Sequence, residues 1–271
     1  MPGMRRGALL RETFRRPWPA AGTVNGLERL YDPYQGGWPD GYIPFMRDPL
    51  LLLDTGSPLV SVALARDGAV VAERFVEQHR SSALLLDLVR EVLEEAGIGV
   101  QDLGGIAALR GPGSFTGLRV GLATALGLHQ ALGVPATALP SLQALAVAAP
   151  ADEGEIVIAA VDALRGDWSA QAFAAGPVPR PLGEMRLVPG PELPHLAGGR
   201  PAVIVGFGVS RLAVSEARLV EPGPLAPAAA RLAMAADAEW NPQLLVSPIY
   251  SRPPAVSLPR PRTAVPVSRE A

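Results

Sequence analysis

The residues best suited to chemistry in this chain lie in two short glycine-containing segments. Asp54-Thr-Gly-Ser57 follows a run of four leucines, and Gly111-Pro-Gly-Ser-Phe-Thr-Gly117 stands between an apolar run and a long Ala/Leu/Gly segment. A glycine-rich turn between a strand and a helix directs backbone N–H groups and the positive end of the helix dipole at one point, which suits an anion. The candidate nucleotide- or phosphate-binding residues are Asp54, Thr55, Gly56, Ser57, Gly111, Gly113, Ser114 and Thr116.

The sequence leaves three interpretations of the Asp54–Ser57 segment open. It resembles a phosphate loop of the actin and sugar-kinase type, it resembles the catalytic Asp-Thr-Gly of an aspartic protease, and it suits a plain hairpin turn. A protease needs two such aspartates close together. The chain has no second Asp-Thr-Gly or Asp-Ser-Gly, so a protease would have to be a homodimer, and the Ala/Leu-rich helical segments contradict a mostly β enzyme.

The glycine loop differs from a Walker A motif because it has no lysine. A phosphate bound there would depend on backbone N–H groups and on Ser114, Thr116 and Arg119. The alternative is a tight turn in which Thr116 caps the following helix.

Composition excludes several other kinds of site. The chain has no cysteine, and His79, His129 and His195 are too far apart in sequence to form a paired metal motif, so we expect no metal centre. The formal net charge of −2 gives no global attraction for nucleic acid. Residues 120–151 carry no charge, but prolines interrupt them, so we expect a globular, cytoplasmic protein without a membrane span.

Hydrophobic periodicity predicts an α/β protein with two lobes. The elements follow the order β-β-β-α-β-α, then a weaker version of the same order. We predict strands at 50–54, 59–65, 69–76, 105–109, 134–138, 155–161, 168–173, 186–188 and 202–205, and helices at 82–96, 117–132, 141–149 and 224–236. The predicted organisation is a disordered or non-native extension over 1–45 with Met46 as the natural start, an N-terminal lobe over 46–140, a C-terminal lobe over 141–252 and a disordered Pro-rich tail over 253–271.

The helix predicted at 117–132 carries small residues at helical spacing. Gly117, Gly121 and Ala125 form one stripe, and Ala123, Gly127 and Ala131 form a second. Each glycine inside a helix costs up to ~1 kcal/mol relative to alanine, so a close packing partner must compensate. The sequence does not decide whether that partner is internal or another chain.

These motifs together resemble one family. Gly111–Gly121, preceded by Leu50-Leu-Leu-Leu-Asp-Thr55 and a hairpin and followed by the closing Ser247-Pro-Ile-Tyr-Ser-Arg252, is similar to the bacterial TsaB (YeaZ) proteins over about residues 46–252. The resemblance implies an actin-like (ribonuclease H-like) two-lobed fold with mixed sheets flanked by helices. It has two departures, because Gly56 replaces the usual serine and Leu164 is inserted before Arg165 in the usual Asp-Ala-Arg.

The resemblance also implies a function in tRNA modification. Members of that family support formation of threonylcarbamoyladenosine beside the anticodon, as non-catalytic subunits that pair with TsaD, which transfers the threonylcarbamoyl group, while the ATPase TsaE joins the complex. We therefore expect a scaffold subunit that meets tRNA through the complex, requires no cofactor and is able to form a homodimer. The expected partner-interface residues, on the first two long helices, are Leu85, Leu88, Val92, Gly117, Gly121, Ala125 and Leu128.

Two alternatives remain beside this reading. The first is an actin-fold ATPase or kinase that binds ATP or ADP with Mg²⁺ through Asp54 and the Gly111–Gly117 loop, and the second is an aspartic protease. We also expect Gly121→Leu to block pairing while leaving the fold mostly intact.

Overall fold

The structure is a computed structural model of the chain. It describes residues 48–77, 81–235 and 237–252, with only the backbone of residues 81–83. The predictions for residues 1–45, for Met46 as the start and for the tail at 253–271 fall outside these ranges. No helix in the described ranges is both long and apolar enough to cross a membrane.

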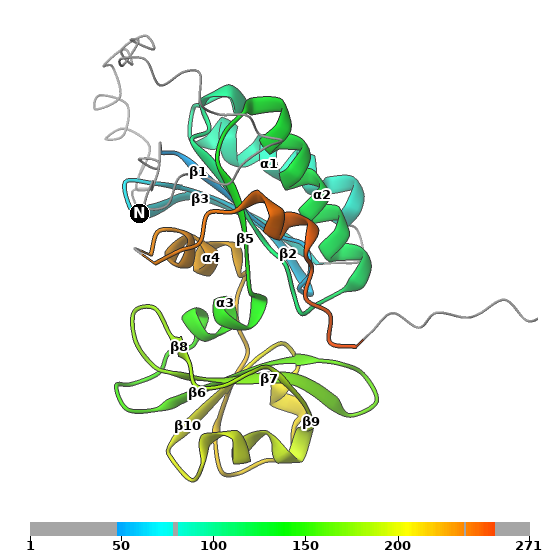
Figure 1. The fold of residues 1–271 in the computed structure, drawn as a ribbon, viewed down its shortest axis with the longest axis vertical. Helices are drawn as coiled ribbons and strands as arrows, with labels where there is room; N and C mark the ends of the chain where they lie inside the picture. Colours follow the sequence, from blue (N-terminus) through cyan, green and yellow to red (C-terminus); the bar gives the residue numbers. More distant parts are fainter. Residues whose placement is uncertain (1–47, 78–80, 236, 253–271) are drawn as a thin grey trace, which may run out of the picture. The chain divides into compact units, whose positions relative to one another are not determined.

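The first sheet combines an antiparallel hairpin region with parallel strands. Its strands are β1 (Leu50–Asp54), β2 (Leu59–Arg66), β3 (Ala69–Glu77), β4 (Gly105–Leu109) and β5 (Ala136–Leu139), in the order β3-β2-β1-β4-β5 (Figure 1). β1 pairs antiparallel with β2 and parallel with β4. Because β1 is central and covered on both faces, it accommodates four consecutive leucines instead of an alternating pattern.

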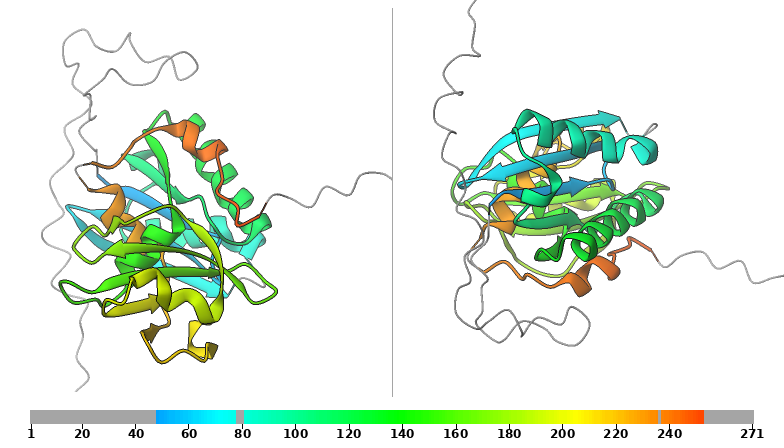
Figure 2. Two further views of the ribbon diagram at one scale, coloured as in Figure 1. Left: turned by 60° about the horizontal axis from the view of Figure 1, so that its bottom comes forward. Right: turned by 90° about the horizontal axis from the view of Figure 1, so that it is seen from above.

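Two long helices cover one face of this sheet, as Figures 1 and 2 show. They are α1 (Ser81–Glu95) and α2 (Phe115–Leu132), and a short 3-10 turn, η2 (Val100–Asp102), follows α1. The apolar stripe of α1 packs into the core on this face together with leucines of β1 and β2. The buried residues of α1 recur at the three- and four-residue spacing of an amphipathic helix: Leu85, Leu88, Val89, Val92 and Leu93.

The second sheet repeats the connectivity of the first. Its strands are β6 (Ile156–Asp162), β7 (Asp167–Ala174), β8 (Arg180–Pro181), β9 (Arg186–Pro189), β10 (Ala202–Val205) and β11 (Arg218–Val220), in the order β11-β10-β6-β7-β8, with β9 also paired to β7. β6 pairs antiparallel with β7 and parallel with β10. Two mixed sheets with this repeated order are the actin-like, ribonuclease H-like fold that the sequence predicted.

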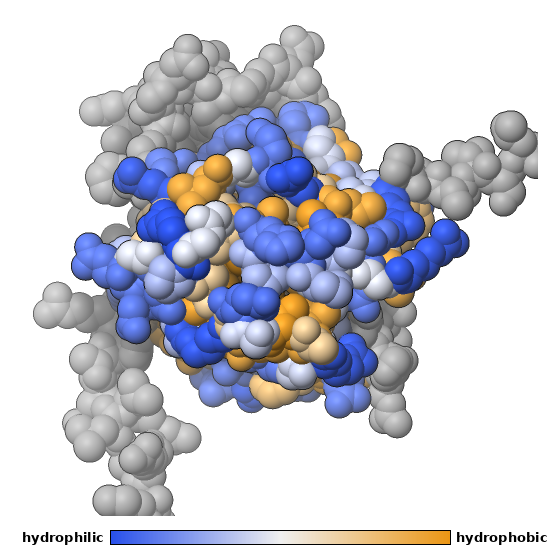
Figure 3. Space-filling model, turned by 90° about the horizontal axis from the view of Figure 1, so that it is seen from below, coloured by the Kyte–Doolittle hydropathy of each residue, from blue (hydrophilic) through white to orange (hydrophobic). Residues whose placement is uncertain are grey.

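The outer face of the second sheet is covered by 3-10 segments. They are η3 (Gly190–Ala197) and η4 (Val209–Arg211), and they share a core cluster with the strands. In Figure 3, which shows the molecule from below, apolar side chains lie in small separate groups among hydrophilic ones. This face therefore presents no single continuous apolar patch.

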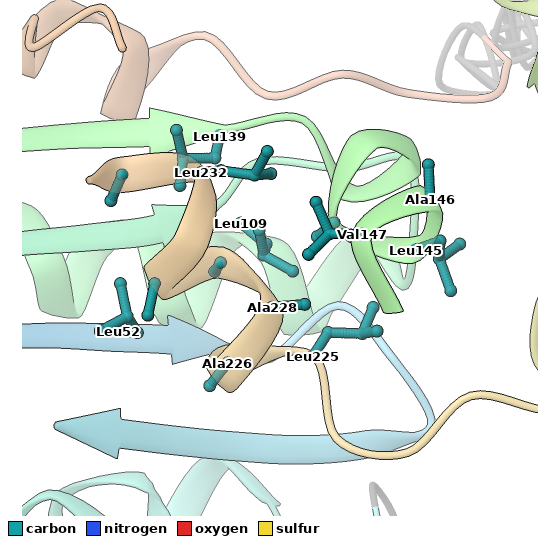
Figure 4. Close-up of a cluster of buried hydrophobic side chains, with 14 of the residues drawn as sticks. Leu52, Leu109, Leu139, Leu145, Ala146, Val147, Leu225, Ala226, Ala228 and Leu232 are labelled. Carbon is teal, nitrogen blue, oxygen red and sulfur yellow. The ribbon is translucent and has the colours of Figure 1, made fainter. Parts of the chain in front are cut away.

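Two short helices lie in the core shared by the two sheets. α3 (Ser141–Ala148) and α4 (Ala226–Ala233) contact each other, and the cluster around them contains residues of both sheets. Figure 4 shows the two helices beside Leu52, Leu109 and Leu139 of the first sheet. α4 is mostly alanine, which allows its backbone to approach β2 closely. The Ser61 hydroxyl on β2 accepts a hydrogen bond from the Ala226 N–H at 3.1 Å, so the helix start is anchored to the sheet.

The end of the chain returns to the first sheet, which differs from the predicted lobe boundary at 141–252. α4 packs on β1, β2 and β4, and the 3-10 segment η5 (Pro242–Val246) packs on β5 and α2. The first lobe is thus completed by residues far along the sequence. The physical reason is that the second face of the first sheet is also apolar and needs a cover.

Candidate functional site

The first candidate segment is a turn held together by its own aspartate. The Asp54 Oδ1 atom accepts hydrogen bonds from the N–H groups of Gly56 at 3.0 Å and Ser57 at 3.3 Å. The Ser57 hydroxyl adds a further hydrogen bond to the same carboxyl. Asp54 is 0% exposed, so this turn directs its carboxylate inward, where it fixes the backbone instead of meeting a ligand.

Burial perturbs the protonation of Asp54. Loss of hydration raises the pKa of its carboxyl to about 6, and the hydrogen bonds from Ser57 and Gly56 lower the pKa only in part. Its second oxygen, Oδ2, is buried without a hydrogen-bond partner among the described residues. A carboxylate in this position carries an electrostatic cost at neutral pH.

The second candidate segment is the glycine loop that joins β4 to α2. Gly111 has φ +104° and precedes a cis Gly111–Pro112 bond. The Ser114 hydroxyl accepts a hydrogen bond from the Gly117 N–H at 3.3 Å, so Ser114 caps α2. The predicted cap, Thr116, is instead an exposed residue of the first helical turn, one step past the helix start.

The two segments pack directly against each other. The Ser114 N–H donates to the Gly56 carbonyl at 2.8 Å. A Cβ at Gly113 would lie 2.7 Å from that same carbonyl oxygen, and a Cβ at Gly56 would lie 2.6 Å from a methyl of Leu118. Glycine is required at 113 because the two backbones touch there, whereas a side chain at 56 would have to displace the Leu118 side chain of α2. The glycines therefore serve contact between the two turns.

The first small-residue stripe of α2 also packs inside the chain. The Thr55 hydroxyl donates to the Gly117 carbonyl at 2.7 Å, and a Cβ at Gly121 would lie 2.1 Å from the Thr55 oxygen. This contact explains why glycine stands at 121. Among the predicted partner-interface residues, Leu128 is half-buried, and the other six are buried within the chain: Leu85, Leu88, Val92, Gly117, Gly121 and Ala125.

The second small-residue stripe lies on the surface. Ala123, Gly127 and Ala131 are all exposed, and a Cβ at Gly127 would meet nothing within 4 Å. On α1, Leu86 is 63% exposed. The open surface of these helices is therefore formed by residues other than those selected from the sequence.

A cleft of about 520 Å³ lies where the two turns face the second lobe. Gly56, Ser57, Gly113 and Ser114 line one side, and the second-lobe side includes the turn from Val161 to Leu164; the other lining residues are Pro58, Pro112, Phe115, Ser141, Leu145, Phe207, Leu225, Ser251 and Arg252. Of the predicted ligand-binding set, the structure brings these first four into the cleft. Asp54 and Thr55 lie buried behind them and Thr116 points outward from the helix.

The charged groups of the cleft do not suit a nucleotide triphosphate with Mg²⁺. Arg252 forms an ion pair with Asp167 at 2.5 Å. Asp162 accepts a hydrogen bond from the Leu164 N–H at 2.7 Å, and Leu164 and Arg165 both have positive φ, of 66° and 61°. Asp54 is buried, and the two charged residues that line the cleft, Asp162 and Arg252, each already form a contact within the chain.

The closing Ser247–Arg252 segment is fixed on the glycine loop. The Ile249 N–H donates to the Arg110 carbonyl at 2.7 Å, and the Arg110 guanidinium donates to the Ser247 carbonyl at 3.3 Å. A Cβ at Gly111 would lie 2.2 Å from the Ile249 carbonyl oxygen. The Ser247–Arg252 segment therefore packs on the loop that leads into α2 and holds it in place.

Beside this segment lies an aromatic–arginine cluster formed by Phe115, Arg119 and Tyr250. The Arg119 guanidinium carbon is 3.9 Å from the centre of the Phe115 ring, and the Tyr250 ring centre is 5.0 Å from it. Arg119 Nε donates to the Tyr250 hydroxyl at 3.3 Å. Sequence reasoning missed this cluster as a unit, although the i, i+4 spacing of Phe115 and Arg119 places them on one helix face.

Comparison with known proteins gives consistent relatives. Residues 61–173 match the family model of TsaD, the tRNA N6-adenosine threonylcarbamoyltransferase. The tRNA threonylcarbamoyladenosine biosynthesis protein TsaB of Haemophilus influenzae is 37% identical to this chain, over 42% of this chain and 49% of the relative. The protein of the same name from Escherichia coli is 34% identical, over 44% of this chain and 52% of the relative. The chain thus spans about half the length of these curated relatives.

A solved structure agrees over a longer stretch. YeaZ from Pseudomonas aeruginosa matches with a TM-score of 0.64 and 27% identity, covering 74% of this chain and 99% of that chain. The repeated mixed sheets define a protein of the actin-like class. Within that class, the chain is similar to the TsaB (YeaZ) proteins and, over residues 61–173, to TsaD.

Proposed function

We propose that this chain is a non-catalytic accessory subunit in the formation of threonylcarbamoyladenosine in tRNA. In this proposal it pairs with a TsaD protein, which transfers the threonylcarbamoyl group, and TsaE joins the complex in the cytoplasm. Support comes from the TsaB proteins of two bacteria, at 37% and 34% identity over part of the chain, and from the match to the TsaD family model.

The geometry of the two turns supports the non-catalytic part of the proposal. The Asp54 carboxylate, which an actin-fold kinase would direct at its metal, is fully buried and holds the backbone of Gly56 and Ser57. The glycine loop is occupied by its contact with Gly56. Neither element is poised for phosphoryl transfer, and the kinase alternative has no specific observation in its favour.

The observation that carries the pairing part is the exposed glycine of α2. Gly127 lies within a helix of 18 residues, where glycine costs ~1 kcal/mol relative to alanine. No described residue comes within 4 Å of its Cβ position, so no contact among the described residues offsets this cost. With Ala123 and Ala131 exposed on either side, the helix can be approached closely by another backbone, and we place the TsaD contact here.

Two substitutions at Gly127 test this assignment. Gly127→Leu adds bulk into open space, so the isolated chain should keep its fold while losing the complex with TsaD from the same organism. Gly127→Ala adds a single methyl group at the same point and should weaken the complex, but less than Gly127→Leu does. The measurement is size-exclusion chromatography with light scattering, followed by a tRNA modification assay with TsaD and TsaE.

Several outcomes would contradict the proposal. A Gly127→Leu chain that still binds TsaD like the wild type would move the contact away from this face. Wild-type protein that forms no complex with TsaD, or only a homodimer, would oppose pairing itself. Mg²⁺-dependent ATP hydrolysis by the isolated chain, abolished by Asp54→Asn, would favour the kinase alternative.

A further inference from the structure

We propose that this chain contacts tRNA directly, and that its aromatic–arginine cluster is a stacking platform for an unpaired RNA base. The inference rests on the proposed function, because it takes tRNA as the substrate of the complex. It goes further by assigning part of the tRNA contact to Phe115, Arg119 and Tyr250 of this chain.

The first argument is the position of the Phe115 ring. Phe115 is the first residue of α2 and is 41% exposed, although it is a large apolar side chain. The Arg119 guanidinium and the Tyr250 ring hold it in place, and Phe115 also lines the cleft of about 520 Å³. The ring is therefore fixed by its neighbours and still accessible from the cleft. Single-stranded RNA is recognised by stacking its bases on aromatic rings of this kind.

The second argument is the local charge. Arg119 is exposed, and it forms no ion pair with a carboxylate in the parts of the chain that the structure describes. The α2 sequence carries no Asp or Glu, and neither does the adjoining Ser247–Arg252 segment. An exposed arginine on a helix without acidic residues is free of local repulsion toward anions, which favours its binding to the phosphates of a nucleic acid. α1 is the contrast, since its single arginine pairs with Asp87 and Glu94.

The third argument is the chemistry of the cleft itself. Its lining is largely apolar, and its volume lies within the ~300–1,000 Å³ of ordinary ligand pockets. The Asp162 carboxylate on the opposite wall would repel a phosphate but would accept a hydrogen bond from the amino group of a base. We therefore place the base in the cleft against Phe115 and the phosphate outside, near Arg119.

The test uses the full complex of this chain with TsaD and TsaE, and an unmodified tRNA that reads codons beginning with A. Phe115→Leu keeps an apolar side chain but removes the aromatic face, and it should raise the Kd for tRNA at least about fivefold, the low end of the effect of losing one stacked base. Phe75→Leu is the matched control, because Phe75 is 52% exposed on β3 and lies away from the cleft. Its Kd should equal that of the wild type.

Charge is tested in the same way. Arg119→Gln should weaken tRNA binding about two- to tenfold. It should also reduce the slope of log K against log salt concentration by about the amount that one phosphate contact contributes. Arg186→Gln removes an exposed arginine from β9 in the second lobe and should change neither quantity.

The outcomes separate this inference from the proposed function. The stacking platform would be overturned if the Phe115→Leu and Arg119→Gln complexes assemble and bind tRNA like the wild type. The proposed function would still stand in that case, provided that the wild-type complex modifies tRNA. Loss of TsaD binding in Phe115→Leu would show that Phe115 meets a protein, which also overturns the platform. A wild-type complex that fails to modify tRNA would refute the proposed function itself.

Discussion

The same substitution at two glycines of α2 should change stability in opposite directions. Gly121→Ala places a Cβ 2.1 Å from the Thr55 hydroxyl oxygen and 3.2 Å from two further Thr55 atoms. Thr55 is buried and its hydroxyl is bonded to the Gly117 carbonyl, so the side chain cannot simply turn away. Gly127→Ala places a Cβ in open space on the same helix.

The magnitudes follow from the contacts. At Gly121, overpacking costs ~1–3 kcal/mol and the strained Thr55 hydrogen bond ~0.5–1.5 kcal/mol, against a gain of ~1 kcal/mol in helix propensity. We therefore expect Gly121→Ala to lower the free energy of unfolding by about 1–3 kcal/mol. At Gly127 only the propensity gain applies, so we expect an increase of up to ~1 kcal/mol.

Thermal or urea unfolding of the isolated chain measures both effects. For a protein of this size 1 kcal/mol corresponds to ~2–4 °C in Tm, so the two variants should differ by at least several degrees. If Gly121→Ala stabilises the chain as Gly127→Ala does, the internal contact between α2 and Thr55 is not present and the reasoning is refuted. The earlier expectation that Gly121→Leu spares the fold is accordingly replaced by one of strong destabilisation.

Two further predictions concern buried polar groups. Burial raises the pKa of Asp54 from 3.8 to about 6, so the folded state binds this proton more tightly than the unfolded state does. The difference contributes about 3 kcal/mol to the free energy of unfolding below about pH 4, and this contribution is lost as the pH rises to about 6. Asp54→Asn should therefore gain more in Tm over the wild type at about pH 7.5 than at about pH 4.5, and an equal gain at both would disprove the burial argument. Ser61→Ala should cost ~1–3 kcal/mol in urea unfolding because the buried Ala226 N–H loses its acceptor. Ser169→Ala is its control and should be nearly neutral, since the buried Ser169 hydroxyl has no hydrogen-bond partner in the described part of the chain; equal costs for the two would count against the Ser61 contact.

The sequence was sufficient for the strands and helices whose patterns are local. The four leucines of β1, the Asp-Gly hairpin and the apolar stripe of α1 each predicted an element that the structure contains. The repeated order of elements was sufficient to predict two mixed sheets. Each of these patterns reflects a period or a turn within a few residues, so no knowledge of distant contacts was needed.

The candidate site depended on contacts that a local pattern does not encode. The two small-residue stripes of α2 have the same spacing, and only the position of Thr55 decides that Gly121 faces inward while Gly127 faces outward. The sequence placed the segment of α4 in the C-terminal lobe, whereas the structure packs it on the first sheet, because Ala226–Ala233 is apolar enough to cover either sheet. The Phe115–Tyr250 contact joins residues 135 positions apart, and no period predicts it.

The return of the chain to the first sheet also sets a time order for its synthesis. The last strand of that sheet ends at Leu139, whereas α4, which covers one of its faces, begins roughly ninety residues later. At ~5–20 residues per second, the ribosome needs on the order of 5–20 s to supply that helix. During this interval the leucines on that face, Leu50 and Leu52 among them, lack their final cover. The nascent first lobe therefore passes through an aggregation-prone stage that ends only when the last part of the described chain has been made.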